Sequence, residues 1–286
     1  SLYAMANYET TLEGLPLRGN VGLRVVNTEV TSSSFRQGYE ITETDGEFTI
    51  DEVGDALPVS TTSDYTTLLP SLTAIWDVAD DKLVRFGAFR AISRPDPADL
   101  GFSRSFATQN SIDDEPITNP NDLISNVTAN GSPAIGPLTS WNFDLGFEWY
   151  PNADSIFAVG TYFKQFSGDF ENVVQNETFT VDGVDITRPV SGLQEVTNET
   201  SNLWGLEITG SHRFSYLPGY LSGLGVKASY NHVESDFEFE DSLYGDRFVT
   251  QLDGTIVQTN EGIVAPGGLP GLSENVFSGT VYYQIG

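Results

Sequence analysis

The chain has 286 residues, of which 40 are acidic and 13 basic, so its formal net charge is −27 at pH 7. Binding to a nucleic-acid backbone needs clustered Lys and Arg, and this composition excludes that class of partner. The absence of cysteine excludes disulfides, thiolate metal sites and a thiol nucleophile. No apolar run approaches the roughly 18 to 20 residues of a transmembrane helix, so a membrane-inserted form would have to cross as strands.

Nine stretches show the period-two alternation of polar and apolar residues that predicts β-strands. They run through residues 2–10, 17–32, 65–78, 82–93, 140–150, 155–166, 201–214, 225–235 and 273–284. Short turns alternate with long polar loops between them. The short turns are 13–16, 79–81, 151–154 and 216–224, and the loops are about 36–64, 95–138, 170–200 and 236–270. In a meander, this places all long loops at one end of the sheet, as in outer-membrane barrels.

The clearest of these strands form a predicted β-hairpin. Phe143, Leu145, Phe147 and Trp149 alternate with polar or small residues, and a Pro-Asn-Ala-Asp turn leads into the second arm. One face is therefore apolar and the other polar. The apolar face is interpreted as facing lipid and the polar face as facing a lumen.

The same alternation assigns the other side chains to faces. The polar face is expected to line a hydrated interior, and its charged members are Arg24, Arg85, Asp144, Glu148, Glu207 and Lys227. Large rings near the strand ends suggest aromatic belts at the lipid interfaces, formed by Trp76, Trp141, Trp149, Tyr150 and Trp204. Packing of these rings in a protein core is the alternative.

Acidic residues concentrate in the long loops. These loops hold 27 of the 40 acidic residues and one Arg each, whereas the strands and short turns are nearly neutral. This suits a wall in lipid, because a charge facing lipid at mid-depth costs about 2–4 kcal/mol. Solvation of loops in a soluble protein would also account for much of the pattern.

Candidate binding residues lie in the longest loop, 95–138. Phe102, Phe106 and Arg104 are candidate ligand contacts, since rings above a lumen could stack on a sugar, although packing among the loops is the alternative. No catalytic or cofactor motif is found, and the two histidines lack metal-ligand spacing. Calcium binding is considered for the acidic stretches 43–47 and 236–246, neither of which has EF-hand spacing.

Several segments taken together resemble a known family. Their order, their spacing and the run Arg94-Pro95-Asp96 are similar to the C-terminal barrel portion of TonB-dependent outer-membrane receptors, particularly the proteobacterial branch associated with carbohydrate uptake. The segments are GLPLRGNVGLRVVNTE at 14–29, the stretch 65–100, GSPAIGPLTSWNFDLGFEWY at 131–150, LWGLEI at 203–208, the stretch 217–235 and LPGLSENVFSGTVYYQIG at 269–286. Family members usually carry Asn and Lys where this chain has Ser132 and Gly136, which weakens any role for those two positions.

The resemblance implies an all-β fold: an antiparallel transmembrane β-barrel segment in the outer membrane of a Gram-negative bacterium. It also implies a small nutrient ligand, outer-membrane lipid and the TonB complex as partners. In the family pattern of about 22 strands, these nine correspond to roughly the tenth to the eighteenth. We therefore expect residues 1–286 to be a partial barrel without a plug domain. Nine such strands cannot close into an antiparallel barrel, so the fragment is not expected to transport anything alone.

The leading hypothesis is active uptake of an oligosaccharide nutrient, because an acidic mouth repels anionic ferric chelates. A siderophore or other metal chelate is the alternative ligand. Hypotheses of another class are a non-transporting outer-membrane adhesin or structural barrel, and a secreted glycan-binding β module.

Overall fold

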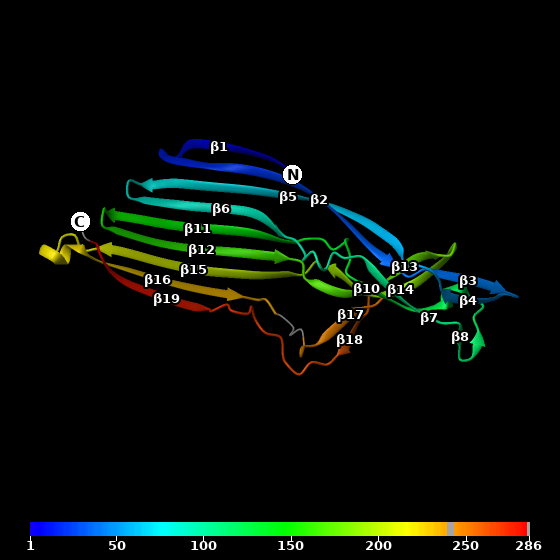
Figure 1. Ribbon diagram of the computed structural model, residues 1–286. Coiled ribbons are helices and arrows are strands. Elements are labelled where there is room, and N and C mark those ends of the chain that lie inside the picture. Colours follow the sequence, from blue (N-terminus) through cyan, green and yellow to red (C-terminus); the bar gives the residue numbers. More distant parts are fainter. Residues whose placement is uncertain (239–242, 285–286) are drawn as a thin grey trace.

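A computed structural model describes residues 1–238 and 243–284 of the chain. Nine long strands form one antiparallel sheet, here called the wall (Figure 1). In order across the sheet they are β1 (Leu2–Leu12), β2 (Leu15–Arg36), β5 (Leu57–Ala79), β6 (Lys82–Ser93), β11 (Leu138–Asn152), β12 (Ser155–Ser167), β15 (Thr200–Arg213), β16 (Leu224–Ser235) and β19 (Asn275–Tyr283).

The wall confirms the all-β prediction and the nine predicted strands. Each wall strand pairs with the next wall strand along the chain, so the sheet is an up-and-down meander. Because the number of strands is odd, β1 and β19 run in the same direction and cannot pair antiparallel with each other. Each of these two strands pairs with a single neighbour among the described residues.

Three of the connections between wall strands are tight turns, as predicted. Leu12 pairs with Leu15, Ala79 with Lys82 and Asn152 with Ser155, which leaves two residues in each turn. The connection between β15 and β16 is longer and contains the short 3-10 helix η2 (Gly219–Gly223). No helix among the described residues is long and apolar enough to cross a membrane.

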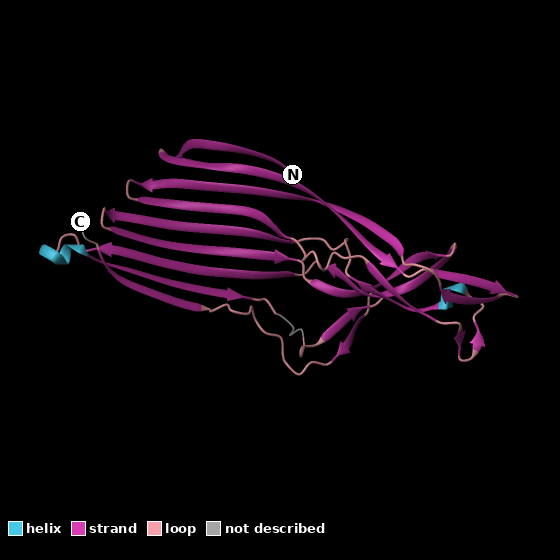
Figure 2. Ribbon diagram, viewed as in Figure 1, coloured by secondary structure: helices cyan, strands magenta, loops and turns pink. Residues whose placement is uncertain are grey.

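A second sheet, here called the cap, lies beyond the opposite end of the wall (Figure 2). It has six strands in the order β18 (Ile256–Asn260), β17 (Arg247–Thr250), β13 (Phe170–Val181), β14 (Val184–Val196), β10 (Ile124–Asn130) and β7 (Ser103–Thr108). The remaining elements are β3 (Tyr39–Thr44), β4 (Glu47–Glu52), β8 (Ser111–Ile112), β9 (Glu115–Pro116) and the 3-10 helix η1 (Pro120–Leu123).

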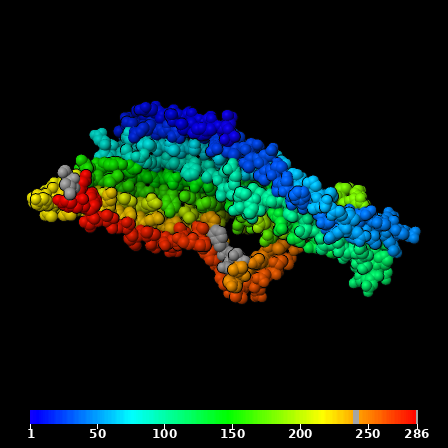
Figure 3. All heavy atoms as spheres, in the orientation of Figure 1, coloured from blue at the N-terminus to red at the C-terminus, as the bar shows by residue number. Residues whose placement is uncertain are grey.

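The four segments expected to be long loops do connect wall strands, but they are not irregular. Strand makes up most of 36–64 and 170–200 and a smaller part of 95–138 and 236–270, and β2 and β5 extend 1 and 8 residues into the first of them. The cap is a mixed sheet, because β10 pairs parallel to β14 and β13 pairs parallel to β17. Figure 3 shows the cap as a narrower extension of the broad wall.

The main cluster of buried apolar side chains lies in the cap and the elements packed beside it, not in the wall. Its members are Ile50, Ile117, Leu123, Ile124, Val127, Ala129, Val173, Phe179, Val181, Ile186, Val190 and Leu193. The wall has no such layer, since a single sheet can bury side chains only against another element. Its large apolar side chains are instead exposed along one face.

Two Asp-Gly turns shape the hairpins of this region. Asp45 and Gly46 have φ of 56° and 84°, and Asp182 and Gly183 have φ of 47° and 79°. Positive φ at both central residues is the geometry of a type I′ turn, whose twist matches that of the flanking strands. These turns close the β3–β4 and β13–β14 hairpins.

Candidate functional site

The polar face of the wall carries a shallow cavity of about 500 Å³. Its floor is lowered by glycines on neighbouring strands, since Gly146 lies opposite Gly160 and Gly87 lies opposite Asp144. Its lining includes the charged side chains of Arg85, Asp144 and Glu207 and the hydroxyl group of Tyr162. The cavity thus brings together three of the predicted polar-face residues.

Arg85 is neutralised by a neighbour on the same face. Its Nε donates to Glu148 Oε1 at 2.5 Å, and the Tyr150 hydroxyl donates to the other oxygen of Glu148 at 2.5 Å. The charged groups of this face are therefore partly paired with one another. Such pairing lowers the cost of grouping charges on one surface.

The other two predicted polar-face residues lie farther out on the sheet. Arg24 Nη2 donates to the Ser1 hydroxyl at 3.5 Å, near the open edge of β1. Lys227 lies over the ring of Tyr282, with its Nζ 5.5 Å from the ring centroid. Neither residue lines the cavity.

The opposite face of the wall is apolar, and aromatic side chains lie near both ends of its strands. Trp141 stacks on Phe143 and Trp149 packs against Phe157, with centroid distances of 6.2 and 5.7 Å. Trp204 contacts the ring of His232 at 5.5 Å. These rings occupy both ends of the apolar face, where the sequence predicted belts.

One of the predicted belt residues differs from that pattern. Tyr150 lies on the polar face, because its hydroxyl donates to Glu148. Strand side chains alternate, which puts Tyr150 on the opposite face from its neighbour Trp149. Trp76 lies on the apolar face, because it pairs with Val84, which pairs with Phe147 of that face.

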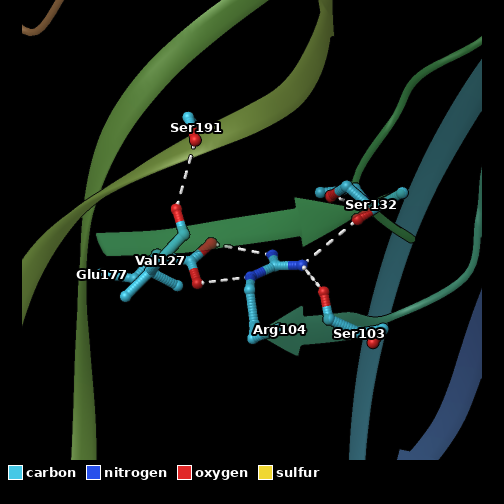
Figure 4. Close-up of polar contacts among 8 residues, drawn as sticks. Ser103, Arg104, Val127, Ser132, Glu177 and Ser191 are labelled. Atoms are coloured by element: carbon cyan, nitrogen blue, oxygen red, sulfur yellow. Dashed lines mark hydrogen bonds and ion pairs between the residues drawn. The ribbon is translucent and has the colours of Figure 1, made fainter. Parts of the chain in front are cut away.

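Arg104 is held inside the cap (Figure 4). Its side chain is 4% exposed, and Nε and Nη2 each donate to one carboxylate oxygen of Glu177 at 2.8 Å. Its Nη1 donates to the carbonyl oxygens of Ser103 at 2.9 Å and Gly131 at 3.3 Å. This bidentate pair joins β7 to β13 across the sheet.

Phe102 and Phe106 pack beside this pair. The guanidinium of Arg104 lies 4.6 Å from the ring centroid of Phe102. Phe106 contacts Phe179 edge-on at 4.9 Å and stacks on Tyr39 at 5.9 Å. Burial raises the pKa of the Tyr39 hydroxyl. All three predicted contacts thus take part in packing of the cap, and ligand contact by them stays a prediction.

The acidic stretches do not form a compact cluster in the described part of the chain. Residues 43–47 form the exposed β3–β4 turn, and residues 239–242 of the second stretch lie outside the described residues. Among the residues that the structure covers, no three His, Asp or Glu side chains gather as a metal site requires. Calcium binding stays a prediction.

The family model of the TonB dependent receptor-like β-barrel matches residues 1–286. The chain belongs to this family. Proteins of the family reside in the outer membrane of Gram-negative bacteria and are receptors and transporters. Among curated proteins, none matches the chain significantly.

Solved receptors are also similar to this TonB-dependent receptor barrel, at low sequence identity. The siderophore receptor PirA from Acinetobacter baumannii is 13% identical with a TM-score of 0.42, over 86% of this chain and 37% of PirA. The Serratia marcescens hemophore receptor HasR is 14% identical with a TM-score of 0.48, over 98% of this chain and 40% of HasR. The FrpB iron transporter from Neisseria meningitidis is 14% identical with a TM-score of 0.42, over 82% of this chain and 25% of FrpB. This chain therefore spans less than half the length of these receptors, and a likeness of this size says nothing about its ligand.

Sequence reasoning missed Glu177 as the partner of Arg104. The two residues are 73 positions apart, and no local pattern links them. The Asp-Gly pairs at 45–46 and 182–183 were a usable signal, because Asp-Gly between alternating stretches predicts a hairpin. Reading them would have identified four of the strands beyond the wall.

Proposed function

We propose that the chain forms part of the wall and the extracellular mouth of an outer-membrane receptor for active, TonB-driven uptake of a small nutrient. The observation that carries the proposal is the contrast between the two faces of the wall. One face exposes large apolar side chains on most of its strands, an arrangement that is stable in lipid and a liability in water. The other face carries charges of both signs and the cavity.

The cap supports an orientation for this wall. Outer-membrane barrels have short periplasmic turns and long extracellular connections. By this rule the two-residue turns face the periplasm and the cap stands outside the cell. The candidate contacts Phe102, Arg104 and Phe106 then lie in the region that a ligand meets first.

The open edges of β1 and β19 support a wall completed by further strands. An unpaired strand edge in lipid leaves backbone groups without partners, each costing several kcal/mol. Further strands would supply these partners and close the barrel. Coupling to TonB would then act through parts of the receptor other than the described sheets.

Charge favours a neutral ligand. The long connections hold 27 acidic residues against four Arg, so they repel an anionic ferric chelate and are indifferent to a neutral oligosaccharide. An oligosaccharide is therefore the ligand proposed, with a metal chelate as the alternative. The test is uptake of radiolabelled oligosaccharides and ferric chelates by the parent strain, by a strain lacking the gene and by a strain lacking TonB.

The proposal expects oligosaccharide uptake that disappears in both deletion strains. If the deletion strains lose only chelate uptake, the protein is a transporter whose ligand is a metal chelate and not an oligosaccharide. An outer-membrane protein whose deletion changes no uptake would favour an adhesin or structural barrel. A protein recovered from the culture supernatant would favour a secreted glycan-binding module.

A further inference from the structure

β2 and β5 carry an exposed ladder of polar side chains beyond the apolar part of the wall. The two strands pair without interruption from Leu17 opposite Trp76 to Arg36 opposite Leu57. On the apolar face, the last apolar pair before the ladder is Val25 opposite Leu68. The next four pairs on that face, here called the hydroxyl ladder, are Asn27–Thr66, Glu29–Asp64, Thr31–Thr62 and Ser33–Ser60.

The hydroxyl ladder points away from the cap. All eight of its residues are exposed, whereas the residues between them on both strands are half-buried. The buried side of the ribbon is the one that meets the cap. There the Phe102 backbone N–H donates to the Ser32 hydroxyl at 2.9 Å, and Arg36 Nη2 donates to the Thr180 carbonyl at 3.1 Å.

Cross-strand hydrogen bonds hold the ladder in a fixed arrangement. Asn27 Nδ2 donates to Thr66 Oγ1 at 3.2 Å, the Thr31 and Thr62 hydroxyls lie 2.9 Å apart, and the Ser33 hydroxyl donates to Ser60 at 3.2 Å. A hydroxyl has one donor and two acceptor positions, so these groups keep capacity for a further partner. A ligand would find them already oriented, which reduces the entropy cost of binding.

The position and the charge of the ladder identify its partner. It continues the face that the proposed function puts against lipid, so it reaches the layer directly outside the acyl chains, which in the outer leaflet is the saccharide of a glycolipid. Its one charged pair, Glu29 opposite Asp64, has a single sign and disfavours a phosphate. Beyond the ladder, the ring of Phe35 is 71% exposed and offers an apolar face to a sugar ring.

We propose that the hydroxyl ladder docks the saccharide headgroup of the outer-leaflet glycolipid, with its hydroxyl and amide groups bonded to neutral sugar hydroxyls. This inference rests on the proposed function, because it needs the apolar face to lie in the outer membrane. It concerns the lipid that surrounds the receptor and not the nutrient that passes through it.

The test measures binding of fluorescent lipopolysaccharide to the purified full-length receptor in detergent. Two probes are compared: lipopolysaccharide with its core sugars, and lipid A, which keeps its glucosamine disaccharide but lacks the core sugars. The variant is Thr31→Val with Thr62→Val, which removes two hydroxyls and keeps shape and strand propensity. The matched control is Thr178→Val with Thr187→Val, an exposed cross-strand pair in the cap with hydroxyls 2.8 Å apart.

The ladder variant is expected to bind the core-containing probe about tenfold more weakly, because it lacks two hydroxyls that would bond to the sugar. Binding of lipid A and the cap control should not change. Unchanged binding of the core-containing probe would overturn the proposal and leave the ladder to a protein partner. Equal weakening of lipid A, or equal weakening in the control, would also overturn it.

Folding of each variant is checked by its heat-modifiable migration on a gel. If the threonine variant fails this check, Ser33→Ala with Ser60→Ala replaces it, with the same expectation and the same contradicting results. Cell fractionation separates this proposal from the one on which it rests. A receptor in the outer membrane whose ladder variants bind normally refutes the ladder alone, whereas a receptor in the soluble fraction refutes the proposed function.

Discussion

Replacing Arg104 by Met is predicted to loosen the cap without affecting the wall. The substitution leaves the Glu177 carboxylate, which is 29% exposed, without its bidentate partner. Breaking a buried ion pair by removing one partner costs 3–5 kcal/mol. Because water reaches part of Glu177, we take about 3 kcal/mol, the low end of that range. At 1.4 kcal/mol per tenfold, the equilibrium for opening the cap should rise about 100-fold.

Hydrogen exchange of the full-length receptor in detergent measures this change. Peptides from β7, β10 and β13 should exchange faster in the Arg104→Met variant, while peptides from β11 and β12 should keep their protection. The control is Arg188→Met, because Arg188 lies 3.7 Å from Asp122 in a more exposed pair of the same region. We expect that control to cost less than about 1 kcal/mol. Normal exchange in the cap, or faster exchange in the wall, would refute the reasoning.

Three further substitutions test the fold at other places. Leu145→Arg, on the apolar face, should lower the free energy of unfolding by about 2–4 kcal/mol and reduce the amount of folded barrel on a gel. Thr209→Arg, on the polar face, should do neither. Equal losses in the two variants would contradict the claim that the two faces meet different solvents. Gly183→Val puts a branched side chain at a φ of 79° and should cost about 1–2 kcal/mol, seen as faster surface proteolysis of β13, and Gly267→Val, where a Cβ meets open space, serves as control. Hydrogen bonds from Lys82 and, to a smaller extent, from the Trp149 indole hold the pKa of the Asp81 carboxyl below its usual value. The ionised Asp81 carboxylate therefore stabilises the folded state at neutral pH, and this contribution is lost as the pH falls through the lowered pKa. An NMR titration midpoint for Asp81 at or above the usual value would contradict this.

The wall could be predicted because the pattern that specifies it lies within each strand. Alternation along one strand decides which side chains share a face, and this holds for Phe143, Leu145 and Phe147 without reference to the rest of the chain. The same rule, applied strictly, would have placed Tyr150 with Glu148 on the polar face. Its assignment to the apolar face came from counting rings near a turn instead of following the alternation.

The cap could be predicted only in part because many of its strand pairings join segments that are far apart in the sequence. Its hairpins had Asp-Gly signals, but its parallel pairings join segments far apart in the chain, such as Val127 with Val190. The pairing of Arg104 with Glu177 is of the same kind. These stretches were predicted to be loops because they are rich in acidic residues. Their apolar residues form a core only when the strands pair with one another.

The central claim is that the two faces of the wall meet different solvents, lipid on one side and water on the other. Residues 1–286 contain no cysteine, so single cysteines placed in turn at the six positions from Phe143 to Glu148 add one thiol each to this part of the receptor. The measurement is labelling of the full-length receptor in intact outer membranes with a charged, membrane-impermeant maleimide. The account predicts labelling at Asp144, Gly146 and Glu148 and protection at the three positions between them. Equal labelling at all six positions, or the opposite alternation, would contradict it.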